Sequence, residues 1–161
     1  MKTKIILLVA FFAFATSSVS AQFYAMKKVL ITEVVDKSED GLSQGTKAMI
    51  RAALTSAITA SEGCVGYDTI SILQIDSTFD RHGNVTKTIL SYVQKQQMEY
   101  VLVTEATPLD KSTILLSARI IKTDTGKIVG TSSIRTVATL DCLQSSSRTL
   151  ANNLIRSIFS I

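Results

Sequence analysis

The residues best suited to chemistry in this sequence include a single histidine, His82, which lies beside Asp80 in a polar segment. Nucleophilic catalysis needs a serine or cysteine within hydrogen-bond reach of such a ring, and a carboxylate that orients the ring. The sequence contains no G-x-S-x-G motif that would present such a serine. We therefore expect His82 to be an exposed loop residue, and we predict no catalytic residues.

Metal and phosphate sites are also poorly supported. One histidine and two widely separated cysteines, Cys64 and Cys142, cannot supply the ligand set of a zinc site. The segment Gly41 to Gly45 precedes a predicted helix, where backbone N–H groups could meet an anion. It lacks the lysine of a phosphate-binding loop, so a turn and a helix start are favoured. The sequence predicts no metal and no cofactor.

A group of acids offers one further kind of chemistry, because paired carboxylates can hydrolyse glycosidic bonds. These acids follow the first predicted strand or lie within it: Glu33, Asp36, Glu39 and Asp40. A solvated connection explains them equally well. An envelope hydrolase that uses this acidic cluster is kept as the alternative function.

The first 21 residues have the pattern of a secretory signal peptide. Lys2 and Lys4 precede an apolar run that is shorter than the roughly 20 residues of a spanning helix, and small residues end the segment at Ala21. Gln22, and not a lipid-accepting cysteine, follows the expected cleavage site. We predict export to the periplasm as a soluble protein, without a membrane span.

Removal of the segment 1–21 leaves residues 22–161, a length that fits one domain with an ordinary core. Both of its lysines are lost with it, so 15 basic residues remain against 13 acidic ones, a net charge of +2. The basic residues are scattered, and Lys27-Lys28 is the one adjacent pair. The sequence therefore predicts no nucleic-acid partner.

The elements that must position these residues follow from hydrophobic periodicity. Strands are predicted at Val29–Val35, Asp68–Ile75, Tyr100–Thr104, Thr113–Lys122 and Lys127–Val137, and helices at Leu42–Ala60, Thr86–Gln97 and around Leu140–Ile158. Loops are predicted at Ser61–Gly66 and Pro108–Lys111. The tight Asp124-Thr125-Gly126 turn joins the last two strands as an antiparallel hairpin. The order βαβαβββα predicts an α/β (α+β) fold, with a mixed five-stranded sheet and three helices.

Four segments carry a family resemblance: KVLITEVVD, GTKAMIRAALTSAI, MEYVLVTEA and ARIIKTDTGKIV, in that order. On these, residues 22–161 resemble the periplasmic α/β domain shared by TolB amino-terminal domains, the curli secretion channel protein CsgG and the LpoB-type activators of penicillin-binding proteins. The resemblance implies a non-enzymatic accessory or binding module of the cell envelope. Its partner would be an envelope protein, such as a penicillin-binding protein or an outer-membrane assembly. Assembly into a homo-oligomer is an alternative that the resemblance leaves open.

The sequence departs from this family pattern in two places. LpoB and CsgG proteins typically carry a lipidated cysteine, which is absent after Ala21, and the long membrane-entering hairpins of the curli channel have no counterpart here. The resemblance therefore does not extend to a pore.

Cys64 and Cys142 could form a disulfide in an oxidising compartment. The inferred strand directions place the two cysteines at opposite ends of the sheet, about the length of a helix apart. A disulfide needs Cα atoms within about 7 Å, so the strand directions disfavour the bond. Two buried thiols and an intermolecular bridge are the alternatives.

The predicted last strand offers a partner-binding edge through Thr131, Ser133 and Arg135, flanked by Ser132 and Thr136. An exposed edge could accept a partner strand, but the favoured interpretation is that the polar side chains keep that edge soluble. Asp76-Ser77-Thr78 and Asp68-Thr69-Ile70 also fit a bacterial O-glycosylation pattern. Glycosylation at these motifs is a further hypothesis.

Overall fold

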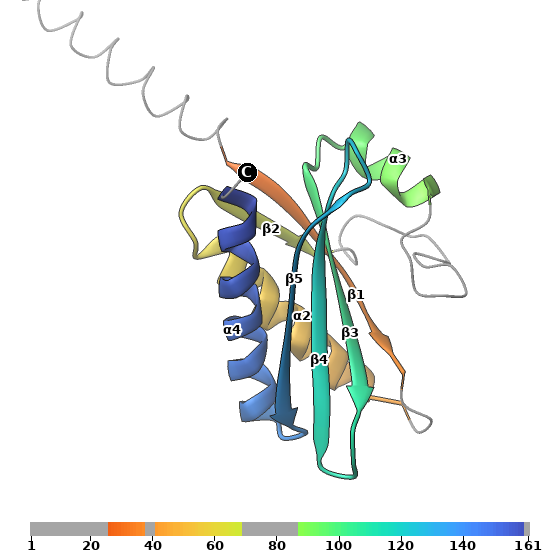
Figure 1. Cartoon of the computed structure of the whole chain (residues 1–161), viewed down its shortest axis with the longest axis vertical. Helices are drawn as coiled ribbons and strands as arrows, with labels where there is room; N and C mark the ends of the chain where they lie inside the picture. Colours follow the sequence, from red (N-terminus) through yellow and green to blue (C-terminus); the bar gives the residue numbers. More distant parts are fainter. Residues whose placement is uncertain (1–25, 38–40, 69–86, 160–161) are drawn as a thin grey trace, which may run out of the picture.

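The computed structural model describes residues 26–37, 41–68 and 87–159. Within them, five strands form one mixed sheet, and three helices pack against it (Figure 1). The elements, in chain order, are β1 (Lys27–Asp36), α2 (Gln44–Thr59), β2 (Cys64–Asp68), α3 (Lys87–Lys95), β3 (Tyr100–Pro108), β4 (Thr113–Lys122), β5 (Ile128–Val137) and α4 (Leu140–Phe159). The predicted fold class and element order are therefore confirmed.

The order of strands across the sheet is β2-β1-β3-β4-β5. β1 runs parallel to both of its neighbours, and the β3–β4 and β4–β5 pairs are antiparallel. The predicted hairpin turn lies between β4 and β5, where the Gly126 N–H donates to the Lys122 carbonyl oxygen at 2.8 Å. β2 and β5 are thus the two edges of the described sheet.

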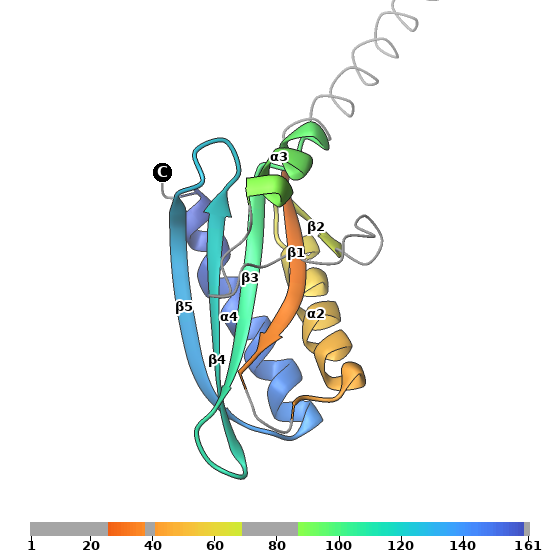
Figure 2. The ribbon, with the colours of Figure 1, turned by 90° about the vertical axis from the view of Figure 1, so that its right-hand side faces the viewer.

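Helices α2 and α4 cover one face of the sheet, as the two views together show (Figure 2). Ser43 caps the start of α2, because its hydroxyl accepts a hydrogen bond from the Thr46 N–H at 3.1 Å. The helix buries an apolar stripe at Ile50, Leu54 and Ile58. These side chains join a core made with the inward residues of the strands and with Leu143, Leu150, Ala151, Leu154, Ile155 and Ile158 of α4. The Gly41–Gly45 segment therefore serves as a helix start.

Helix α3 lies over one end of the opposite face, where Val93 packs in a second, smaller cluster with Leu30 and Val101. Along β3–β5, the rest of that face carries charged and polar side chains, such as Glu105 and Ser117, together with the apolar Leu115. In β4 every second side chain from Ile114 to Ile120 is buried toward α2 and α4. The sheet therefore has one fully covered face and one face that is only partly covered.

Three predicted boundaries are wrong. β2 begins at Cys64, inside the segment predicted as the loop Ser61–Gly66, and β3 continues to Pro108, where a loop was predicted. α3 ends at Lys95, and Gln97 has φ 57°, a left-handed conformation that stops the helix. Most of the strand predicted at Asp68–Ile75 lies outside the described residues.

Candidate partner-binding site

Thr131, Ser133 and Arg135, predicted as a partner-binding edge, lie together on the edge strand β5. They alternate along β5 and are exposed. Their partners in β4 are Arg119, Ser117 and Leu115, respectively. All three therefore point to the partly covered face of the sheet, away from α4.

A charged cluster adjoins this edge on the same face. The Glu105 carboxylate forms ion pairs with Lys37 and Arg119. The distance is 3.0 Å from Oε2 to the Lys37 Nζ and 3.1 Å from Oε1 to a terminal nitrogen of Arg119. Glu105 lies opposite Ser117, which in turn lies opposite Ser133. The cluster and the edge thus border one hollow of about 160 Å³. Of the charged side chains in this cluster, Glu105 and Arg119 line the hollow, so their charges balance there.

Arg135 makes an ion pair at the other end of this surface, with 3.7 Å between a guanidinium nitrogen and the Asp110 Oδ2. The Ser112 backbone N–H, which donates to Asp110, is the main cause that lowers the pKa of that carboxyl. Both side chains are exposed, so solvent screening weakens their attraction. Arg135 is therefore held loosely and can turn to another partner.

A larger hollow of about 580 Å³ lies where the end of β5 meets the first turns of α4. Arg135 and Val137 line it from the strand, and Asp141, Cys142 and Ser145 line it from the helix. Val137 is 47% exposed. The sequence did not indicate this hollow, because its walls come from two elements whose relative position only the fold supplies.

Cys64 and Cys142 are both free thiols in the structure. Cys64 pairs with Lys27 at the start of β1, whereas Cys142 lies by the hollow at the Val137 end of β5. The length of the sheet separates these two ends, so no intramolecular disulfide forms between them. Cys64 is 1% exposed, and burial raises the pKa of its thiol.

The two thiols are expected to differ sharply in reactivity. The thiolate is the reactive form, so the raised pKa and the burial of Cys64 should make it slow, whereas the exposed Cys142 should react at once. Labelling of the native protein with a thiol reagent should modify a single site, and the Cys142→Ser variant should show no fast phase. Fast modification of Cys64 in that variant would contradict the packing around β2.

The acidic cluster does not form a paired-carboxylate site among the described residues. Asp36 is buried, accepts a hydrogen bond from the Leu42 N–H and lies 3.6 Å from the Lys47 Nζ. These contacts join the end of β1 to the start of α2. Glu33 is exposed, and Glu39 and Asp40 lie outside the described residues. Asp36 therefore has a structural role.

His82, the Asp76-Ser77-Thr78 motif and the expected signal peptide lie outside the described residues. Of the second motif, Asp68-Thr69-Ile70, only Asp68 is described. Within residues 26–37, 41–68 and 87–159, no three histidine, cysteine or acidic side chains gather as a metal site. In the same part of the chain, we find no helix with the length and apolar character that a membrane crossing requires.

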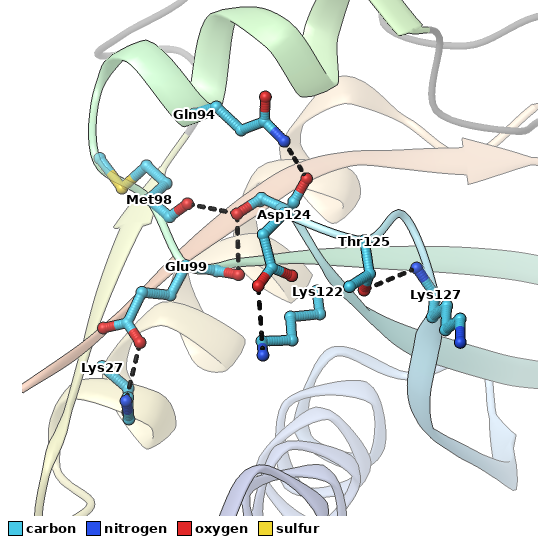
Figure 3. A network of polar contacts seen from close by, with 9 residues as sticks. Lys27, Gln94, Met98, Glu99, Lys122, Asp124, Thr125 and Lys127 are labelled. Atoms are coloured by element: carbon cyan, nitrogen blue, oxygen red, sulfur yellow. Dashed lines mark hydrogen bonds and ion pairs between the residues drawn. The ribbon is translucent and has the colours of Figure 1, made fainter.

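A polar network that the sequence did not reveal fastens α3 to the β4–β5 hairpin (Figure 3). The Thr123 hydroxyl lies within hydrogen-bond distance of the carbonyl oxygens of Met98, at 2.6 Å, and Glu99, at 3.0 Å. The Gln94 side-chain amide donates to the Thr123 carbonyl oxygen. Glu99 in turn pairs with Lys27 at 2.8 Å, which raises the pKa of Lys27. Polar contacts therefore hold α3, the start of β3 and the β4–β5 hairpin together at this end of the sheet.

No protein-family model and no curated protein matches the sequence. Several solved structures share its fold, and they include PelC, LpoB and TolB. The PelC dodecamer from Paraburkholderia phytofirmans is 12% identical with a TM-score of 0.54, covering 83% of this chain and 88% of PelC. The LpoB C-terminal domain from Escherichia coli is 15% identical with a TM-score of 0.53, covering 74% and 92%. TolB from Acinetobacter baumannii is 8% identical with a TM-score of 0.58, covering 84% of this chain and 29% of TolB.

These comparisons confirm the predicted resemblance to LpoB and TolB at the level of the fold. The chain corresponds to less than a third of the length of TolB. The resemblance to CsgG stays a prediction.

Proposed function

We propose that this chain is an exported, non-enzymatic accessory module of the cell envelope, and that edge strand β5 pairs with a strand of another polypeptide. The observation that carries the proposal is the edge itself. β5 ends the described sheet and exposes Thr131, Ser133 and Arg135 along its length. An edge strand presents unpaired backbone donors and acceptors, which an extended segment can satisfy.

Two further observations support this function. The fold is that of the LpoB C-terminal domain, and the N-terminal segment has the pattern of a signal peptide. A penicillin-binding protein or an outer-membrane assembly component would be the partner by analogy. PelC is a dodecamer, so self-assembly is a second form that strand pairing could take.

Site-specific photo-crosslinking in the native envelope tests this function. A photoreactive residue in place of Thr131 or Arg135 should capture a defined polypeptide, which mass spectrometry would identify. The same residue in place of Ser56, which is exposed on α2, is the matched control and should capture nothing defined. Equal capture from α2 and β5, or no capture from β5, would contradict the proposal.

A further inference from the structure

Apart from a bulge near its start, the edge strand β5 has little of the protection that natural sheet edges carry. Such edges are usually short, or they contain proline, lysine or inward-pointing charges. β5 is 10 residues long, and its sequence, IVGTSSIRTV, has neither proline nor lysine and a single charge, on Arg135. Figure 2 shows β5 at the margin of the sheet, with no strand of the described chain beyond it. Such a strand invites pairing with another.

Both ends of this strand expose a large apolar side chain. Ile128 is 55% exposed and Val137 is 47% exposed. A bulge places them on the same face, because Ile128 pairs with Ile121 while Gly130 pairs with Ile120, which leaves Val129 as the extra residue. On one face the edge therefore shows, in order, Ile128, Thr131, Ser133, Arg135 and Val137.

This order is self-complementary in one antiparallel register. Directly opposite residues in an antiparallel pair share a face, so a two-fold axis through Ser133 sets Ser133 opposite its own copy. The same axis sets Thr131 opposite Arg135 and, through the bulge, Ile128 opposite Val137. An axis at Arg135 would oppose two like charges, and an axis at Ser132 or Ile134 would leave the apolar ends unmatched.

We propose that two copies of this chain pair antiparallel along β5 about a two-fold axis at Ser133, which joins their sheets into one. The proposal rests on the proposed function, since it names the polypeptide that the edge accepts. The partner is a second copy of this chain, and each apolar end of β5 covers the opposite end of the other copy.

The hollow at the end of β5 agrees with this arrangement. It lies beside Val137, between the strand and the first turns of α4. The Ser133 register brings the start of the second β5, with its Ile128, to this place. The hollow is about 580 Å³ in volume, and its wall on α4, which includes Cys142 and Ser145, is polar.

Engineered cysteines test the register on the purified protein. In a Cys142→Ser background, Ser133→Cys should form an intermolecular disulfide under mild oxidation, because opposite Cα atoms in antiparallel strands lie about 4.5–5.5 Å apart, within disulfide range. Thr131→Cys is the matched control. Its copy would lie four residues away along the strand, about 13 Å, so it should not cross-link to itself.

A charge substitution tests the dimer without a new covalent bond. Sedimentation should show a dimer for the wild type, a monomer for Ser133→Lys, which opposes two like charges, and a dimer for Ser56→Lys, the control on α2. Circular dichroism should show that all three are folded. A monomeric wild type, a dimer that survives Ser133→Lys, or equal cross-linking of Thr131→Cys would overturn the proposal. A monomer whose β5 captures a different envelope protein would overturn the dimer alone and leave the proposed function standing.

Discussion

Replacing Gly130 with alanine is expected to destabilise the protein by about 1–3 kcal/mol, the usual effect of overfilling a packed interior. A Cβ at Gly130 would lie 2.6 Å from the Ser157 Cβ, and that atom belongs to the rigid part of α4. Rotation of a side chain cannot relieve the clash, so α4 or β5 must shift. Urea denaturation followed by circular dichroism would measure the loss.

A second substitution separates this clash from any intrinsic preference of β5. In the Gly130→Ala, Ser157→Gly double variant the clashing atom is absent, so most of the loss should be recovered, apart from about 1 kcal/mol for glycine inside a helix. If the stability losses of the Gly130→Ala and Ser157→Gly single variants simply add in the double variant, close packing between β5 and α4 does not explain why position 130 is a glycine.

Asp36→Ala is expected to lower the free energy of unfolding by about 2 kcal/mol, because it removes a buried acceptor and leaves the Leu42 N–H unsatisfied. It also leaves the largely buried Lys47 without its carboxylate. Asp36→Asn keeps an acceptor and should lose less, and Glu33→Gln, at an exposed position of the same strand, should change stability little. Thermal and urea unfolding of the three variants would rank them.

The same variants decide between the two functions drawn from the sequence. If Asp36 only joins β1 to α2, a panel of peptidoglycan and glycan substrates should show no turnover for wild type or variant. Turnover by the wild type that disappears in a folded Asp36→Asn protein would establish the hydrolase instead.

The order of elements was predictable because most strands and helices bury one face. Burial of one face gives the apolar residues a regular spacing in the sequence, which differs between strands and helices. β4 is the plainest case, with a buried apolar side chain at every second position from Ile114 to Ile120. β2 was less accessible. Gly66 resembles a loop residue in the sequence, yet it lies within β2. The strand needs a glycine at this position, because a Cβ there would be 3.0 Å from Ile31 and 3.1 Å from the Thr55 carbonyl oxygen.

The candidate site was predictable only in part. The alternation of Thr131, Ser133 and Arg135 placed them on one face of a strand, and the structure puts that strand at the edge. Glu105 was missed because its charge suggested the end of β3, whereas it lies within the strand and is balanced by Lys37 and Arg119. The three residues are distant in sequence, and only strand pairing brings them together.

The position of β1 in the sheet has a consequence for how the chain reaches its fold. β1 is the first strand in sequence, but it lies between β2 and β3, and the Thr32 hydroxyl that bonds the Leu102 carbonyl oxygen reaches across 70 residues. The antiparallel strands β3 to β5 are neighbours in sequence and close short loops, whereas β1 must wait for a distant partner. When the chain is synthesised or exported from its N-terminus, β1 emerges well before β3. Until β3 emerges, the apolar residues Val29 to Ile31 lack one of their two neighbouring strands.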